Sequence, residues 1–279
     1  MSRFKLLRSR LALYGGILSL IVIMLSVIGP FIAPYGPLEF SGNLLSPPSR
    51  NHYLGTDGHG RDLFSLILMG GWVTLSLAIT TTFFAGTIGT LWGLMAAYTT
   101  GIKGNIINRT IDFAMSFPSI MTALLVLAVA GTGGKAPLVI AIAFALVPRF
   151  ARVICGSTLP ILEENFILAE KALGAGHLRI LAIHVLPNLV APITVLTSIY
   201  LPFVIMLESS LSFLGLGAPP DVPTWGRIIA DGKVYMQIAP WLTIFPGITI
   251  IFTALGFNLL GDGLRDLLDP RSATRLYTR

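Results

Sequence analysis

Six long apolar runs dominate this sequence and restrict the folds that it can adopt. They cover roughly residues 11–33, 72–98, 112–131, 136–152, 191–216 and 239–261. A helix needs about 20 mainly apolar residues to cross a bilayer, so each run is a candidate span, although the fourth is short and is expected to end near Pro148. The runs are continuous and do not alternate with polar residues, which predicts helices and argues against a membrane β-barrel.

The composition agrees with a membrane location. Hydrophobic residues make up 54% of the chain and charged residues 11%, and the mean hydropathy is +0.80. Such a chain cannot fold as an ordinary water-soluble domain, so we expect an all-α integral membrane protein with six transmembrane helices. The basic start followed by an apolar run is similar to a signal peptide. However, the run is too long and no cleavage site follows it, so we interpret it as the first span.

The distribution of Lys and Arg predicts the orientation in the membrane. With the N-terminus inside, five of the 19 basic residues fall in outer segments: Arg50, Arg61, Lys135, Arg227 and Lys233. Cytoplasmic segments of membrane proteins carry an excess of Lys and Arg. Both termini and residues 149–188 are therefore predicted to be cytoplasmic. The net charge of +6 then reflects topology, and no nucleic-acid partner is implied.

A stripe of small residues repeats at every fourth position of the second run. It consists of Ala85, Gly89, Gly93 and Ala97. Small side chains at this spacing let another helix approach closely. We interpret the stripe as packing within the chain, with an interface to another protein as the alternative.

Two outer segments are too long to be simple turns. In residues 34–71 a Gly-rich turn precedes the second run, and Thr56 or Asp57 is predicted to cap a short interfacial helix there. Residues 216–240 carry Trp225, which we expect at the membrane interface. Both segments either cover the mouth of a pathway or form ordinary membrane-edge structure.

Side chains that could carry chemistry are scarce. The loop at 131–136 is similar to a phosphate-binding loop, but it lacks the first Gly and has Ala136 where Ser or Thr would hold magnesium. We therefore predict that the chain does not hydrolyse ATP and has no catalytic residue. His52 and His59 lack a third ligand, so no metal site is predicted. Cys155 excludes an internal disulfide and is predicted to be a packing residue.

Glu208 is a carboxylate within the fifth apolar run. A charge at membrane depth costs roughly 2.5–3.5 kcal/mol on insertion scales, so Glu208 must face protein or water. It is either a packing carboxylate or one that lines a path.

Residues 149–188 form a polar island between apolar runs. The island contains Leu168-Ala169-Glu170-Lys171-Ala172-Leu173-Gly174-Ala175 and closes on His184-Val185-Leu186-Pro187-Asn188. We predict a loop at the membrane face with two short helices around a Gly-rich turn. Such an element is typical of docking to another protein.

These motifs carry a resemblance to a known family. The island resembles the cytoplasmic Glu-Ala-Ala loop of binding-protein-dependent ABC importer permeases, and it matches that pattern at Ala169, Gly174, Leu186 and Pro187. Further matches are Gly55-Thr56-Asp57-x-x-Gly60-Arg61-Asp62, Ser210-Leu211-Ser212-Phe213-Leu214-Gly215-Leu216-Gly217, Pro223-Thr224-Trp225-Gly226 and the segment from Phe257 to Arg271. Together they are similar to the C-type subunit of the dipeptide, oligopeptide and nickel permeases.

The island also departs from the family pattern at three positions. Leu168 stands where the family usually has Glu, Glu170 where it has the second Ala, and His184 where it has Ile. These departures put the contact of the usual Glu in doubt, whereas the turn at Gly174 is retained.

The resemblance implies a MetI-like permease fold in a multi-pass protein of the bacterial cytoplasmic (inner) membrane. Residues 1–71 would hold the first span and an extracytoplasmic segment. Residues 72–265 would form a core of five spans with a coupling loop at 150–190, and residues 266–279 a cytoplasmic tail. The implied partners are a second homologous permease, two ATPase subunits that hold ATP and magnesium, an extracytoplasmic solute-binding protein and membrane lipid. The chain itself would carry no cofactor.

The expected site residues fall into three groups. The ATPase-coupling group, which the resemblance implies, is Ala169, Glu170, Lys171, Ala172, Leu173, Gly174, Ala175 and Gly176. The expected translocation path includes Glu208, Ser209, Ser212 and Phe213. The expected extracytoplasmic, binding-protein side includes Asp57, Arg61, Asp62, Trp225 and Arg227.

The resemblance implies import by alternating access, in which the ATPases move the coupling loop as a lever. Peptides are the expected substrate, and nickel or a metal chelate is the alternative. A stand-alone secondary transporter or channel is a further alternative. It would need several carboxylates within the membrane, and Glu208 alone is too few.

Overall fold

The computed structural model of the protein describes residues 10–131 and 133–268. Within these ranges the regular elements are helices, joined by loops and one isolated bridge between Thr56 and Asp62. The predicted all-α class is confirmed. The basic residues Arg3, Lys5 and Arg8 and the expected tail from residue 269 onward lie outside the described ranges.

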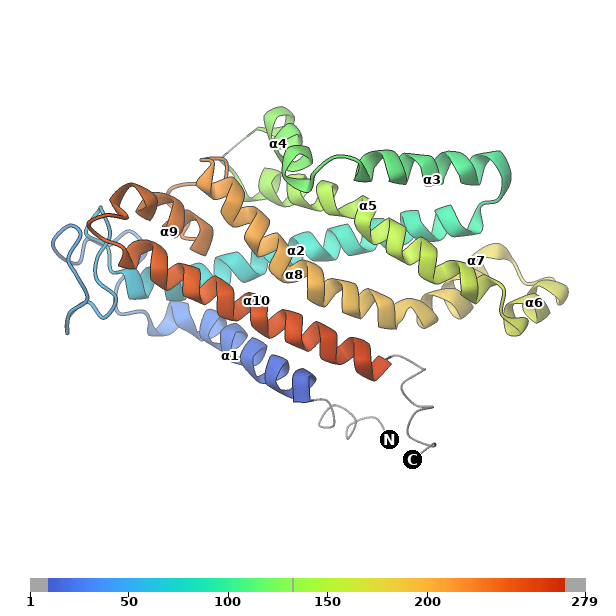
Figure 1. Ribbon diagram of the computed structural model, residues 1–279, viewed down its shortest axis with the longest axis horizontal. Helices are drawn as coiled ribbons and strands as arrows, with labels where there is room; N and C mark the ends of the chain where they lie inside the picture. The colour runs from blue at the N-terminus through green and yellow to red at the C-terminus, as the bar shows by residue number, and fades with distance from the viewer. Residues whose placement is uncertain (1–9, 132, 269–279) are drawn as a thin grey trace.

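Five long helices make up most of the bundle (Figure 1). They are α1 (Arg10–Ile32), α2 (Leu63–Tyr98), α5 (Lys135–Leu162), α8 (Val190–Phe213) and α10 (Trp241–Leu268). The shorter helices are α3 (Gly101–Met115), α4 (Ser119–Ala130), α6 (Asn165–Ala172), α7 (His177–Arg179) and α9 (Trp225–Gly232). A π-helical segment, η2 (Ile180–Val185), and two 3₁₀ turns, η3 (Leu186–Leu189) and η4 (Lys233–Tyr235), complete the described elements.

The predicted spans are present, but the third is not one straight helix. Five helices are long and apolar enough to cross a membrane, and the pair α3 and α4 makes a sixth span if it is counted as one. These two helices meet at a bend of 92°, so a straight span over 112–131 is wrong. Pro118 lies in the break, where it lacks an N–H and disfavours helical geometry at the residue before it.

The other long helices exceed or shift their predicted limits. The second span was expected from residue 72, but α2 begins at Leu63. The expected domain boundary between residues 71 and 72 therefore falls inside this helix. The fourth run was expected to end near Pro148, yet α5 continues to Leu162 because packing against neighbouring helices tolerates the proline. The last two spans, expected at 191–216 and 239–261, are α8 and α10 with the limits given above.

The small-residue stripe lies where α2 packs on α5, the most extensive helix contact in the described chain. A Cβ added at Gly89 would lie 2.4 Å from the Cβ of Phe150, and one at Gly93 would lie 2.5 Å from the backbone oxygen of Ala151. Only glycine permits this close approach of the two backbones. The interpretation as packing within the chain is confirmed.

The two ends of the bundle carry different structures (Figure 1). The segment between α1 and α2 lies at one end with α9. Helices α6 and α7 lie at the opposite end, as do the start of α1 and the end of α10. The Lys and Arg distribution assigns this second end to the cytoplasm. Between the ends, large apolar side chains such as Phe83, Ile88 and Leu91 of α2 are exposed, which suits contact with lipid or another membrane subunit.

Candidate functional site

The predicted coupling residues lie together at the inner end of the bundle, on α6 and the turn that follows it. Helix α6 packs on the end of α5 and on the π-helical segment η2, with Ile167 fully buried as its anchor. Its outer face is apolar and open: Leu173 is 84% exposed, and Leu178, just beyond the turn, is 83% exposed. Exposed apolar side chains of this kind are available for contact with another protein.

Gly174 ends α6 in a left-handed conformation with φ of 79°. The amide of Ala175 donates to the backbone oxygen of Glu170 (3.0 Å), and the amide of Gly174 donates to that of Lys171 (3.1 Å). This is the Schellman pattern of helix termination, in which glycine is favoured because it has no Cβ. The predicted turn at Gly174 is therefore present.

The second predicted short helix is not a separate element. Helix α7 continues through η2 and η3 into α8, so that His177–Phe213 forms one continuous span. The irregular stretch surrounds Pro187, which lacks the N–H for a normal helical hydrogen bond. Single π-helical turns of this kind occur frequently at functional sites.

Glu170 and His184 face one another across the junction between α6 and this stretch. Glu170 Oε1 lies 3.5 Å from His184 Nε2. Both residues are departures from the family pattern, so the structure brings two unusual positions into one contact. The sequence offered no signal for the pair beyond the departures themselves.

The expected path residues divide into two pairs. Ser209 and Phe213 line a hollow of about 380 Å³, and its other lining residues include Ile120 of α4 and Ile229 of α9. These two isoleucines were not predicted, because they lie on other helices that only the packing brings beside α8. Glu208 and Ser212 do not line the hollow and are buried at 1% exposure each.

Glu208 holds α8 against the start of α9. Its Oε1 accepts hydrogen bonds from Ser212 Oγ (2.8 Å) and Thr224 Oγ1 (2.9 Å). A Cβ added at Gly226 would come within 2.6 Å of Oε2. Glu208 was expected either to pack within the protein or to line a path, and the geometry supports packing.

On the outer side, two aspartates organise the Gly-rich turn before α2. Asp57 Oδ1 accepts from the amides of His59 and Arg61 (2.8 Å each), and Oδ2 accepts from Arg61 Nε (2.6 Å). Asp62 caps α2 by accepting from the amide of Ser65 (2.8 Å). The expected cap at Thr56 or Asp57 is wrong, because Asp57 binds within its own turn and the helix it precedes is the span itself.

Helix α9 packs beside this turn. Its cap is Thr224, whose Oγ1 accepts from the amide of Arg227 (3.0 Å). Trp225 was expected at the membrane edge but is 2% exposed, and its ring N–H donates to the backbone oxygen of Ile67 (3.0 Å). Trp225 therefore anchors α9 to α2.

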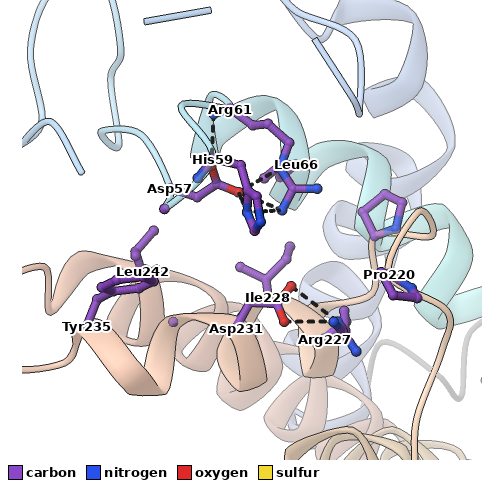
Figure 2. A pocket seen from close by; sticks show the side chains of 13 residues that line it. Asp57, His59, Arg61, Leu66, Pro220, Arg227, Ile228, Asp231, Tyr235 and Leu242 are labelled. Atoms are coloured by element: carbon purple, nitrogen blue, oxygen red, sulfur yellow. Dashed lines mark hydrogen bonds and ion pairs between the residues drawn. The ribbon is translucent and has the colours of Figure 1, made fainter. Parts of the chain in front are cut away.

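Figure 2 shows the cleft between the turn and α9. Arg61 and Asp57 lie on one side, and Arg227 pairs with Asp231 on the other at 3.0 Å. The cleft encloses about 30 Å³, which holds only about two water molecules. It is too small for a substrate, but it places two arginines at the outer face.

No cluster of three metal-ligating side chains occurs in the described part of the chain. His52 instead pairs with Asp62, with 3.0 Å between Nδ1 and Oδ1, and His59 lies on the neighbouring turn, 3.8 Å from Asp57. The phosphate-loop-like segment at 131–136 includes residue 132, which lies outside the described ranges.

The described helices form a bundle with five to six candidate membrane spans, as in a multi-pass membrane protein. The family of binding-protein-dependent transport system inner membrane components matches residues 89–274, and the N-terminal transmembrane domain of oligopeptide transport permease C matches residues 1–48. The chain belongs to this family of ABC importer permeases, whose members are non-catalytic transmembrane subunits of the bacterial inner membrane.

Similar proteins cover nearly the whole chain. A glutathione transport system permease protein of Pectobacterium atrosepticum is 39% identical over 269 residues, which are 96% of this chain and 89% of that protein. A putative peptide transport system permease protein of Brucella suis is 38% identical over 268 residues, covering 96% and 90%.

A solved structure of similar fold is the inward-facing MetNI methionine ABC transporter. Its matching chain has a TM-score of 0.59 at 19% identity, and the match covers 73% of this chain and 96% of that one. At this identity the comparison shows the fold alone, and it confirms the expected MetI-like architecture.

Proposed function

We propose that this protein is one permease subunit of an ATP-driven importer that carries short peptides across the cytoplasmic membrane. The observation that carries the proposal is helix α6, which is exposed at the inner end and closed by the Schellman turn at Gly174. The choice of peptides is supported by the two similar proteins described above, which are a glutathione transport permease and a putative peptide transport permease.

The coupling group would dock in a groove of a partner ATPase, where its small residues permit close approach. The group is Ala169, Glu170, Lys171, Ala172, Leu173, Gly174, Ala175 and Gly176. ATP and magnesium would bind in two such partners, which supply the chemistry. ATP-driven closure would displace α6 as a rigid element, because packed helices switch between discrete arrangements.

The remaining proposed partners contact other faces of the bundle. A second, homologous permease would complete the pathway, with Ser209 and Phe213 facing it from the hollow between α4, α8 and α9. A solute-binding protein would dock on the outer face near Arg61 and Arg227, where the cleft of Figure 2 opens. Lipid would cover the exposed apolar helix faces.

Uptake by the reconstituted complex tests this proposal. The complex is purified with its ATPases, second permease and solute-binding protein, and placed in proteoliposomes. Labelled glutathione, labelled dialanine and radioactive nickel are offered separately, with and without ATP. We expect ATP-dependent accumulation of at least one peptide and none of nickel. Accumulation of nickel alone would replace the peptide assignment, and failure of the ATPases to co-purify would overturn the importer assignment.

A further inference from the structure

Helix α6 has few attachments to the rest of the molecule, and one of them is electrostatic. Its packing partners are the end of α5 and the segment η2. The apolar attachment is Ile167, which is fully buried. The other is the contact from Glu170 Oε1 to His184 Nε2 over 3.5 Å, in which the side chains are 29% and 23% exposed.

The position of His184 connects this contact to a long helix. His184 belongs to η2, which continues without a break into α8. A displacement of α6 that is transmitted to His184 therefore reaches a helix that extends to Phe213 at the outer end. The π-helical segment around His184 departs from regular α-helical hydrogen bonding. A rotation of the backbone there can be taken up locally or transmitted along α8.

The surroundings of His184 leave Glu170 as its electrostatic partner. Nε2 is buried and, within the described residues, makes no hydrogen bond. The ring of Phe166, also on α6, lies 6.5 Å from the imidazole ring, centroid to centroid. A buried ring nitrogen is costly to leave unpaired, and the Glu170 carboxylate is the charged group in contact with it, 3.5 Å away.

We propose that Glu170 and His184 form the joint through which the coupling helix moves α8. The inference rests on the proposed function, in which the ATPases displace α6. Attraction between a carboxylate and the polar imidazole ring that faces it resists separation, so the joint pulls α8 when α6 moves away, whereas an apolar contact mainly transmits a push. Glu170 and His184 are thus positioning residues for the transport cycle and touch no substrate.

A second contact holds the same stretch from the opposite direction. The hydroxyl of Tyr98, at the end of α2, is hydrogen-bonded to His177 Nδ1 at the start of α7, and the two rings pack edge to face at 5.3 Å. Helix α2 is the central, extensively packed helix of the bundle. The stretch from 177 to 185 is therefore attached to α2 at His177 and to α6 at His184.

A double-mutant cycle in the whole complex tests the joint. The variants are Glu170→Ala, His184→Ile and the double change, which restores the residue types usual in the family. Glu163→Ala, an exposed carboxylate at the end of α5, is the matched control. The reporter is Ser210→Cys at the outer end of α8, and its reaction rate with a membrane-impermeant maleimide is measured with and without ATP and vanadate. The native Cys155 is buried and gives the blank.

We expect each single variant to lose the ATP-dependent change in labelling about tenfold relative to Glu163→Ala, because interacting pairs couple by 0.5–3 kcal/mol. The double variant should lose no more than either single variant, because the interaction is already absent in each of them. Single variants that match Glu163→Ala would overturn the joint, and so would a double variant with the summed loss of both singles.

Co-purification separates this inference from the function on which it rests. If the unmodified complex fails to bind its ATPases, the proposed function fails. If all variants bind the ATPases and label alike, only the joint fails. If the complex with His184→Ile does not assemble, Glu170→Gln replaces it in the test. This change keeps the shape of a partly exposed side chain and removes its charge. It should then show the loss of a single variant, and an unchanged labelling response would overturn the proposal.

Discussion

Glu208 of α8 accepts a hydrogen bond over 2.9 Å from Thr224, the residue that caps α9. The same oxygen accepts from Ser212, one turn along α8. A carboxylate inside the membrane region is thereby used to fasten an outer helix to a span. The two hydroxyl groups that donate to Glu208 are themselves buried, so each depends on Glu208 as its acceptor.

Replacing Glu208 should destabilise the protein, because Glu208→Ala leaves buried hydroxyls without their acceptor. Such a loss costs roughly 1–3 kcal/mol for each unsatisfied group. We expect a lower Tm for the purified complex than with Thr194→Ala, which removes one local bond on the same helix. Glu208→Gln keeps an acceptor oxygen and should lose less. Equal Tm values for Glu208→Ala and Thr194→Ala would contradict the packed role.

The contact between α2 and α5 predicts different outcomes at two neighbouring glycines. A Cβ at Gly89 would meet Phe150 and the backbone oxygen of Val147 at 2.4 and 2.8 Å, whereas one at Gly86 would lie 3.4 Å from the Phe150 ring. Gly89→Ala should therefore cost about 1–3 kcal/mol through overpacking. Gly86→Ala should change the free energy of unfolding little. Urea unfolding of the two variants in detergent measures the difference, and similar midpoints would show that the helices can separate without cost.

At Gly174 the expected defect comes from the backbone and not from crowding. No atom lies within 4 Å of a Cβ built there, yet φ is 79°. Gly174→Val should abolish uptake while the protein remains in the membrane, and Gly174→Asn should retain part of the uptake because Asn tolerates left-handed geometry. Gly156→Ala on α5, where space is also open and φ is ordinary, is the control. Full uptake by the Val variant would remove the coupling role from this turn.

The spans and the Gly174 turn could be predicted because their causes are local. A long apolar run needs no partner to be recognised, and a glycine that follows a helix-forming stretch is a known stop signal. The bend between α3 and α4 was missed because hydropathy counts residues without regard to Pro118. The start of α2 was missed because Thr56, Asp57 and Asp62 are all capping residues, and only the fold shows which one faces the open amides.

The contacts between distant residues could not be predicted. Glu170 lies before the turn at Gly174 and His184 lies in the π-helical segment after it, so no helical spacing brings them to one face. Thr224 reaches Glu208 only because Trp225 is buried against α2 and fixes the position of α9. These positions depend on packing between elements, which a single sequence does not record.

The outer arginines give a final prediction for docking of the solute-binding protein. Arg227 lies on α9 beside the cleft and pairs with Asp231 one turn later, a surface-type pair that contributes little to stability. Arg227→Glu should therefore fold normally but present the wrong charge to an acidic partner surface. We expect the Kd of the labelled binding protein for the complex in nanodiscs to rise about tenfold at low salt, and the difference to shrink as salt screens it.

Arg50→Glu makes the same charge change at an exposed outer position away from the cleft and should alter the Kd by less than about twofold. Since both variants carry the same net charge, equal weakening would mean that only the overall field of the outer face matters, and the cleft would lose its assignment as the docking point.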